Sequence, residues 1–154
     1  MSASGVVLLV IGIVAAVAVV MAAIWIPVVQ WLRLRSAELA RSMASEAAAA
    51  GEQIVIGPVP SMYRGGDSPY PSVKGNAVLM LTDRRLECRM ATGAAITVAA
   101  TDVAGAEEER WFRGAARGGR THVVVSTAGG QRLGFYVADN ARWIAALAPQ
   151  ATTG

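Results

Sequence analysis

Hydrophobic and polar positions follow one pattern near the start of the chain and another beyond it. Val6–Val29 holds 24 residues and no charged side chain. A helix of about 20 apolar residues crosses the hydrocarbon core of a bilayer, and it satisfies its own backbone hydrogen bonds there. This stretch therefore predicts a transmembrane anchor over residues 1–32.

Two other interpretations of the apolar stretch are weaker. A cleaved secretory signal begins with a charged segment and ends in small residues. The chain begins with MSASG, which lacks Lys and Arg, and residues 25–27 (WIP) stand where small residues would be needed. A buried core helix of this length would need a larger surrounding core than 154 residues provide.

Charge placement predicts the orientation of the span. No charged side chain precedes Arg33, and Arg33 and Arg35 follow the span directly. The positive-inside tendency then places the C-terminal part in the cytoplasm and the short N-terminus outside. Trp25 and Trp31 bracket the inner boundary, where indole rings favour the headgroup region. We expect a single-pass protein of the bacterial plasma membrane.

Helix-forming residues continue beyond the span. Residues 33–51 are rich in Ala, Leu, Arg and Glu, and Gly51 is a natural stop, which predicts a juxtamembrane helical stalk. Leu32, Leu39 and Met43 fall roughly along one side of it. This stripe has two interpretations, a contact with a partner helix or the membrane surface, or a solvated stalk that touches its own domain.

Beyond Gly51 the hydrophobic period changes from helical to alternating, which predicts strands. Residues 85–90 (RLECRM) alternate cleanly between polar and apolar, as is typical of a half-buried antiparallel strand. Pro58 and Pro60 predict that the first strand is bent or lies at an edge. The expected strands are Gln53–Tyr63, Asn76–Thr82, Arg85–Met90, Ala95–Ala99, Val103–Phe112, Thr121–Thr127 and Gln131–Val137.

An amphipathic helix is expected after the last strand. Asp139 or Asn140 can cap the segment ARWIAALA. Its apolar side is formed by Trp143, Ile144 and Leu147. A terminal helix of this kind can plug the open end of a small β-sandwich or barrel. The predicted fold is an N-terminal transmembrane helix followed by a mainly-β domain over residues 52–148. That domain is a seven-stranded antiparallel sandwich or barrel capped by a C-terminal helix, with 149–154 as a tail.

Composition narrows the compartment and the partners. The net charge of +3 is too small to indicate a nucleic-acid partner, and it suits a domain held near an anionic leaflet. The single cysteine, Cys88, excludes an intramolecular disulfide and fits a reducing compartment. The basic residues are 13 Arg and one Lys, a bias typical of a GC-rich, actinobacterial genome.

The motifs that would indicate an enzyme are missing from the sequence. His122, the only histidine, is expected as a partly exposed edge residue, and Cys88 is expected in the core. One His and one Cys are too few for a typical zinc site. The chain has no G-x-S-x-G elbow and no phosphate-binding loop, although residue order alone does not exclude a Ser/His/Asp or Cys/His set. We expect no enzymatic activity, no metal and no cofactor.

Two groups of arginines are the candidate binding residues. They are Arg84, Arg85 and Arg89, around the second and third strands, and Arg113, Arg117 and Arg120, in the loop before the sixth. Arginine suits bidentate contacts to phosphate or carboxylate, so both groups predict contact with an anionic lipid headgroup or an acidic partner segment. The alternative is a solvated face that Glu87 and Glu107–Glu109 partly neutralise.

The order of elements resembles the bacterial pleckstrin-homology-like (PH-like) and GRAM-like domains. The resemblance covers about residues 52–148. It is carried by the segments VLMLTDRRLECR (78–89), ITV (96–98), TDVAGAEEE (101–109) and DNARWIAALA (139–148). It implies a non-enzymatic binding or scaffolding module. Phosphoinositide-binding members carry several basic residues between the first two strands, where this chain has Arg64 and Lys74 with Asp67 between them.

Two functions follow from these features. The first is a scaffold or accessory subunit that binds a membrane protein partner through its sheet, stalk and span. The second is peripheral recognition of anionic lipid headgroups by the arginine-rich loop. Membrane lipid and a membrane protein are therefore the expected partners, and the spacing of Gly12 and Ala16 is compatible with a homo-oligomer.

Overall fold

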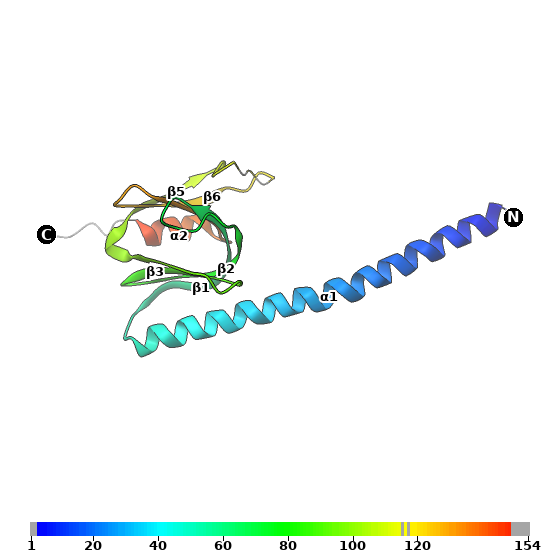
Figure 1. Ribbon diagram of the computed structural model, residues 1–154, viewed down its shortest axis with the longest axis horizontal. Coiled ribbons are helices and arrows are strands. Elements are labelled where there is room, and N and C mark those ends of the chain that lie inside the picture. Colours follow the sequence, from blue (N-terminus) through cyan, green and yellow to red (C-terminus); the bar gives the residue numbers. More distant parts are fainter. Residues whose placement is uncertain (1–2, 115, 117, 149–154) are drawn as a thin grey trace. The chain divides into compact units, whose positions relative to one another are not determined.

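A long N-terminal helix and a mainly-β domain make up the chain. The computed structural model describes residues 3–114, 116 and 118–148. Contacts within the chain divide it into two units, Met1–Arg35 and Ser36–Gly154. The helix α1 (Ala3–Ala49) begins in the first unit and ends in the second (Figure 1).

The first unit consists of the apolar part of α1. Its most apolar window has a mean hydropathy of 3.2, and none of that window is buried. Trp25 and Trp31 are 58% and 59% exposed, and Arg33 and Arg35 are exposed as well. Within the described residues, α1 is the one helix that is long and apolar enough to cross a membrane. The sequence prediction of such a helix is therefore confirmed.

The second unit is built on one sheet of seven antiparallel strands, in the order β4-β3-β2-β1-β7-β6-β5. The strands are β1 (Ile54–Gly66), β2 (Gly75–Thr82), β3 (Arg85–Met90), β4 (Ala95–Ala99), β5 (Val103–Glu109), β6 (His122–Thr127) and β7 (Arg132–Tyr136). A single 3₁₀ turn, η1 (Ala100–Asp102), connects β4 to β5, the two ends of the sheet. The predicted seven-stranded antiparallel domain is confirmed.

The C-terminal helix α2 (Asn140–Leu147) packs against the inner side of the curved sheet (Figure 1). Asp139 caps it, because its carboxylate accepts a hydrogen bond from the Arg142 N–H at 3.1 Å. Trp143 and Leu147 are buried in one cluster with apolar side chains from every strand. The helix therefore covers the side that the sheet leaves open, and the predicted C-terminal helix is confirmed.

The core placement of Cys88 is also confirmed. Its side chain is 1% exposed and lies in the main cluster. Burial raises the pKa of the Cys88 thiol to about 12. A thiol with this pKa is almost entirely protonated near neutrality, and it is therefore a poor nucleophile.

Of the two alternatives predicted for the first strand, the bent strand is observed and the edge strand is not, and the predicted end of the fifth strand is wrong. The first strand does not lie at an edge, because β1 pairs with β2 on one side and with β7 on the other. It is irregular instead, with register shifts between Ile54 and Val59 that accommodate Pro58 inside the sheet. The strand expected over Val103–Phe112 ends at Glu109. The chain leaves the ladder there, and Phe112 is buried separately.

Candidate interaction surfaces

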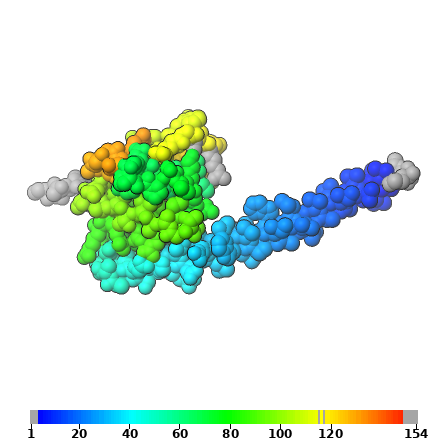
Figure 2. Space-filling view, in the orientation of Figure 1, coloured from blue at the N-terminus to red at the C-terminus, as the bar shows by residue number. Residues whose placement is uncertain are grey.

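The C-terminal end of α1 covers the outer face of β2. Met43 and Ala47 are both 0% exposed, and they form a small apolar cluster with Val78 and Met80. In Figure 2 the C-terminal end of α1, in cyan, lies against the green strands of the domain. Leu39 packs against the same cluster. Of the two interpretations of the stalk stripe, contact with its own domain is therefore the one observed for Leu39 and Met43.

Arg89 joins this helix to the sheet, and a second candidate arginine, Arg85, shares a carboxylate partner with it. Arg89 pairs with Glu46 of α1, with 2.8 Å between Nη1 and Oε1, and its Nε donates to Glu87 at 2.6 Å. Arg85 lies 3.3 Å from both Glu52 and Glu87. Glu87 is 3% exposed, so these two arginines are the counter-charges of a buried carboxylate. Hydrogen bonding to Arg89 lowers the pKa of Glu46. Arg85 and Arg89 are thus engaged inside the domain.

Three further candidate arginines, Arg84, Arg113 and Arg120, lie at the surface. Arg84 is exposed in the turn before β3 and has no ion pair among the described residues. Arg113 Nη1 lies 2.9 Å from Asp67 Oδ1, which joins the loop after β5 to the loop after β1. Arg120 is exposed at the edge of a pocket. Arg117 lies outside the described residues. Arg84 and Arg120 therefore remain the described candidates without an ion pair inside the domain.

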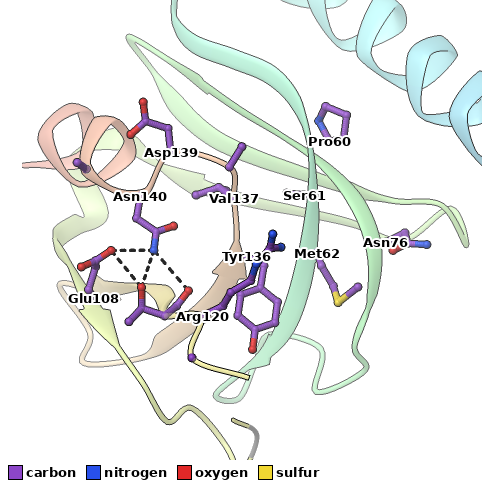
Figure 3. Close-up of a pocket in the computed structure, with 14 residues that line it drawn as sticks. Pro60, Ser61, Met62, Asn76, Glu108, Arg120, Tyr136, Val137, Asp139 and Asn140 are labelled. Carbon is purple, nitrogen blue, oxygen red and sulfur yellow. Dashed lines mark hydrogen bonds between the residues drawn. The ribbon is translucent and has the colours of Figure 1, made fainter. Parts of the chain in front are cut away.

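An open pocket of about 920 Å³ lies between β1, the end of β7 and the start of α2. On one side, Asn140 Nδ2 donates to Glu108 and to the Thr121 hydroxyl, both at 2.8 Å (Figure 3). Figure 3 shows Pro60 and Met62 on the opposite side. The hydrogen bonds of Asn140 connect β5 and the residue before β6 to the first turn of α2. In the chain as described, no group of His, Cys, Asp and Glu side chains is suited to a metal ion.

His122 is buried beside this pocket, so the expectation of a partly exposed edge residue is wrong. It is 0% exposed, because the rings of Phe112 and Tyr136 pack against it. Its ring stacks on Tyr136 with centroids 4.4 Å apart, and its Nδ1 lies 3.2 Å from the Glu109 carbonyl oxygen. Burial, together with the positive charges of Arg64 and Lys74, lowers the pKa of His122. The ring is therefore held in its neutral form near pH 7.

Sequence analysis did not single out Trp111, which is 65% exposed. The next residue, Phe112, is buried against Gly134, where an added Cβ would lie 2.3 Å from the Phe112 ring. Gly134 thus leaves the space in which Phe112 anchors this segment while Trp111 faces solvent. Arg110 and Arg113 flank the two aromatic residues. The signal available in the sequence was the pair of adjacent aromatic residues between two arginines, RWFR (110–113).

Comparison with known proteins does not assign a family. No protein-family model, no curated protein and no solved structure matches this chain. The contacts described above are therefore the basis for any functional conclusion.

Proposed function

We propose that this chain is a single-pass membrane protein whose PH-like domain is a non-enzymatic interaction module. In this proposal it is an accessory or scaffold subunit of a membrane protein assembly in the bacterial plasma membrane. The PH-like assignment is supported by seven antiparallel strands followed by a helix that packs into the core. The orientation, with the domain in the cytoplasm, is supported by the absence of charge before Arg33.

The docking of α1 on β2 and β3 is the observation that carries the proposal. The same helix that holds the apolar segment Val6–Val29 ends in a buried contact through Met43 and in an ion pair between Glu46 and Arg89. The C-terminal end of the helix that holds the apolar segment is therefore part of the folded domain. That property suits a subunit that organises neighbouring membrane proteins.

Co-purification in mild detergent tests this function. The full chain should bring down a protein partner in a constant ratio. A Met43→Asp chain, in which a charge replaces the buried stalk contact, should recover less of that partner. An Ala145→Asp chain is a suitable control, because Ala145 is exposed on α2, outside the sheet, the stalk and the span. Recovery of lipid alone, with no protein in a constant ratio, would contradict the scaffold function.

Peripheral binding of anionic lipid is the second candidate function, and the exposed Trp111 favours it. Indole rings partition to the bilayer interface, and each basic residue near an anionic surface contributes about 1 kcal/mol. Trp111 stands between Arg110 and Arg113, in the same loop as Arg120. The loop RWFRGAARGGR (110–120) holds four Arg and no acidic residue.

Vesicle pelleting measures this second function. We expect the domain (residues 36–154) to pellet with vesicles that contain phosphatidylglycerol and to remain in solution with pure phosphatidylcholine. Arg120→Glu and Trp111→Ala should each lower the bound fraction several-fold, since each removes one interfacial contribution. Arg142→Glu, on the exposed side of α2, is the charge-matched control. Pelleting that is unchanged by the loop variants would rule out the loop as the lipid contact.

A further inference from the structure

β4 is an end strand of the sheet, and one of its sides has no strand partner among the described residues. It pairs with β3 in an unbroken register from Arg89–Ala95 to Arg85–Ala99. The opposite end strand, β5, has a register shift near Gly105 and carries three consecutive glutamates. Bulges and charges of this kind keep an edge strand from pairing with other chains. β4 has neither a bulge nor a charge, and it contains no proline.

Two hydrogen bonds determine which backbone groups of β4 face outward. The Met90 N–H donates to the Ala94 carbonyl and the Ala100 N–H donates to the Arg84 carbonyl, both at 2.8 Å. In an antiparallel ladder the directly bonded pairs recur at every second residue. The even-numbered residues of β4 therefore direct their N–H and C=O groups toward β3, and the odd-numbered residues direct theirs away from it.

The outward-facing residues of β4 are small and uncharged. They are Ala95, Thr97 and Ala99, whose side chains are also exposed, whereas Ile96 and Val98 are buried in the core. Their order, Ala-Thr-Ala, is the same in both chain directions. The free edge thus offers three N–H and three C=O groups in a pattern that is complementary to itself.

We propose that β4 pairs with β4 of a second copy of this chain, antiparallel and about a two-fold axis at Thr97. In this register Thr97 lies opposite Thr97 of the second copy, and each Ala95 lies opposite an Ala99. All three are directly bonded pairs, so about six backbone hydrogen bonds form and every outward group is satisfied. No like charges meet, and no large side chain has to move. The interface is isologous, as in most homodimers.

Membrane attachment compensates for the small area that this short edge can bury. A five-residue strand pair buries far less than the roughly 1,200–2,000 Å² of a stable protein interface. Copies held in one bilayer meet at a much higher effective concentration than copies in dilute solution. The pairing therefore rests on the proposed membrane attachment, and it should be tested on the full chain in its membrane.

Oxidative cross-linking in isolated membranes tests the pairing. Cα atoms of directly bonded antiparallel pairs lie about 5.5 Å apart, within the range of about 4.4–6.8 Å that a disulfide spans. A Thr97→Cys chain should therefore shift from 16.0 kDa to twice that mass on oxidation. The native Cys88 is 1% exposed and does not compete. A Thr101→Cys chain carries an equally exposed site just beyond β4 and should stay at 16.0 kDa.

A second variant tests the register. In the Thr97→Cys chain, the added changes Ala95→Lys and Ala99→Lys place lysines opposite one another at both outer pairs. The cross-linked fraction should then fall at least tenfold, while thermal melting should show that the domain is still folded. The wild-type chain, which has Cys88 as its single thiol, gives the background level of cross-linking.

Three results would overturn the pairing. Equal cross-linking at positions 97 and 101 would show that the anchors bring copies together without a defined edge contact. Absence of a dimer, with the chain retained in alkali-washed membranes, would reject the strand pairing and leave the membrane attachment standing. Cross-linking of Thr97→Cys to a different protein would identify another chain as the occupant of the edge. Loss of the chain from washed membranes would instead count against the proposed function.

Discussion

His122 couples the stability of the domain to pH, because it is buried and its Nε2 has no hydrogen-bond partner among the described residues. Burial lowers the pKa of His122 in the folded state, and Arg64 and Lys74 add to this effect. In the unfolded chain the pKa returns to about 6.5. Below about pH 6.5 the unfolded chain therefore binds a proton that the folded chain does not. The contribution of neutral His122 is complete above that pH, and it is lost as the pH falls toward the folded pKa.

The corresponding variant is His122→Gln, which keeps a donor for the Glu109 carbonyl oxygen and does not titrate. The free energy of unfolding should decrease less for this variant than for the wild type between about pH 7.5 and pH 5. Urea denaturation of residues 36–154 at both pH values measures the difference. His122 is the only histidine, so no other imidazole contributes to it. Identical pH dependence in the two proteins would show that His122 is not held neutral.

At the scale of elements, the junction between α1 and β3 depends unequally on its charged groups. Glu46 is exposed, so its pair with Arg89 is partly screened by water. Glu87 is buried, and Arg89 and Arg85 are its two counter-charges. Removing an exposed partner costs less than about 1 kcal/mol, whereas leaving a buried charge with fewer partners costs several times more.

We therefore expect Arg89→Met to lower the free energy of unfolding by on the order of 2–3 kcal/mol, and Glu46→Gln to lower it much less. In a Glu87→Gln background, Arg89→Met should lower the free energy of unfolding much less, because there is then no buried carboxylate that loses its counter-charge. Urea denaturation of the wild type, the two single variants Arg89→Met and Glu87→Gln, and their double variant gives the coupling energy between Arg89 and Glu87. Equal costs for Arg89→Met in both backgrounds would show that Glu87 does not depend on Arg89.

The bounds of most helices and strands were predictable from the local pattern of side chains. The elements that pack beside each of them were not. β3 and β4 begin and end where the alternation of side chains does, since the pattern at residues 85–90 reports which face is buried. The same alternation does not identify the flanking strands, so the burial of His122 and the central position of β1 were missed. The stalk stripe at Met43 has one helical period whether its partner is a sheet or a second helix.

In the candidate site, too, the types of residue were predictable from the sequence, whereas their partners were not. Sequence identified arginines as the groups suited to anions, and the structure shows that three of them, Arg85, Arg89 and Arg113, have carboxylate partners within the domain. Arg89 and Glu46 are 43 residues apart, a distance in sequence over which no local pattern predicts a contact. Trp111 was missed because exposure depends on Phe112 being anchored over Gly134, on a strand that follows later in the chain.

At the scale of the whole molecule, the contacts divide the chain after Arg35, so the C-terminal end of α1 belongs with the β domain. Two truncations distinguish this division from one after Gly51. Residues 36–154 keep Met43 over Val78 and Met80 and should give a soluble, folded domain. Residues 52–154 lack the helix, so these two side chains, both 0% exposed in the intact chain, would face water. A large apolar side chain contributes about 1.5–3 kcal/mol when it is buried.

For a domain of this size each kcal/mol shifts the midpoint of thermal unfolding by about 4–8 °C. Residues 52–154 should therefore melt at least about 10 °C below residues 36–154, and they should aggregate more readily because an apolar patch on β2 is uncovered. Thermal unfolding followed by circular dichroism, with light scattering on the same samples, measures both effects. If both truncations melted at the same temperature, the end of α1 would be a solvated stalk, and the contact between helix and sheet on which the proposed function rests would not stabilise the domain.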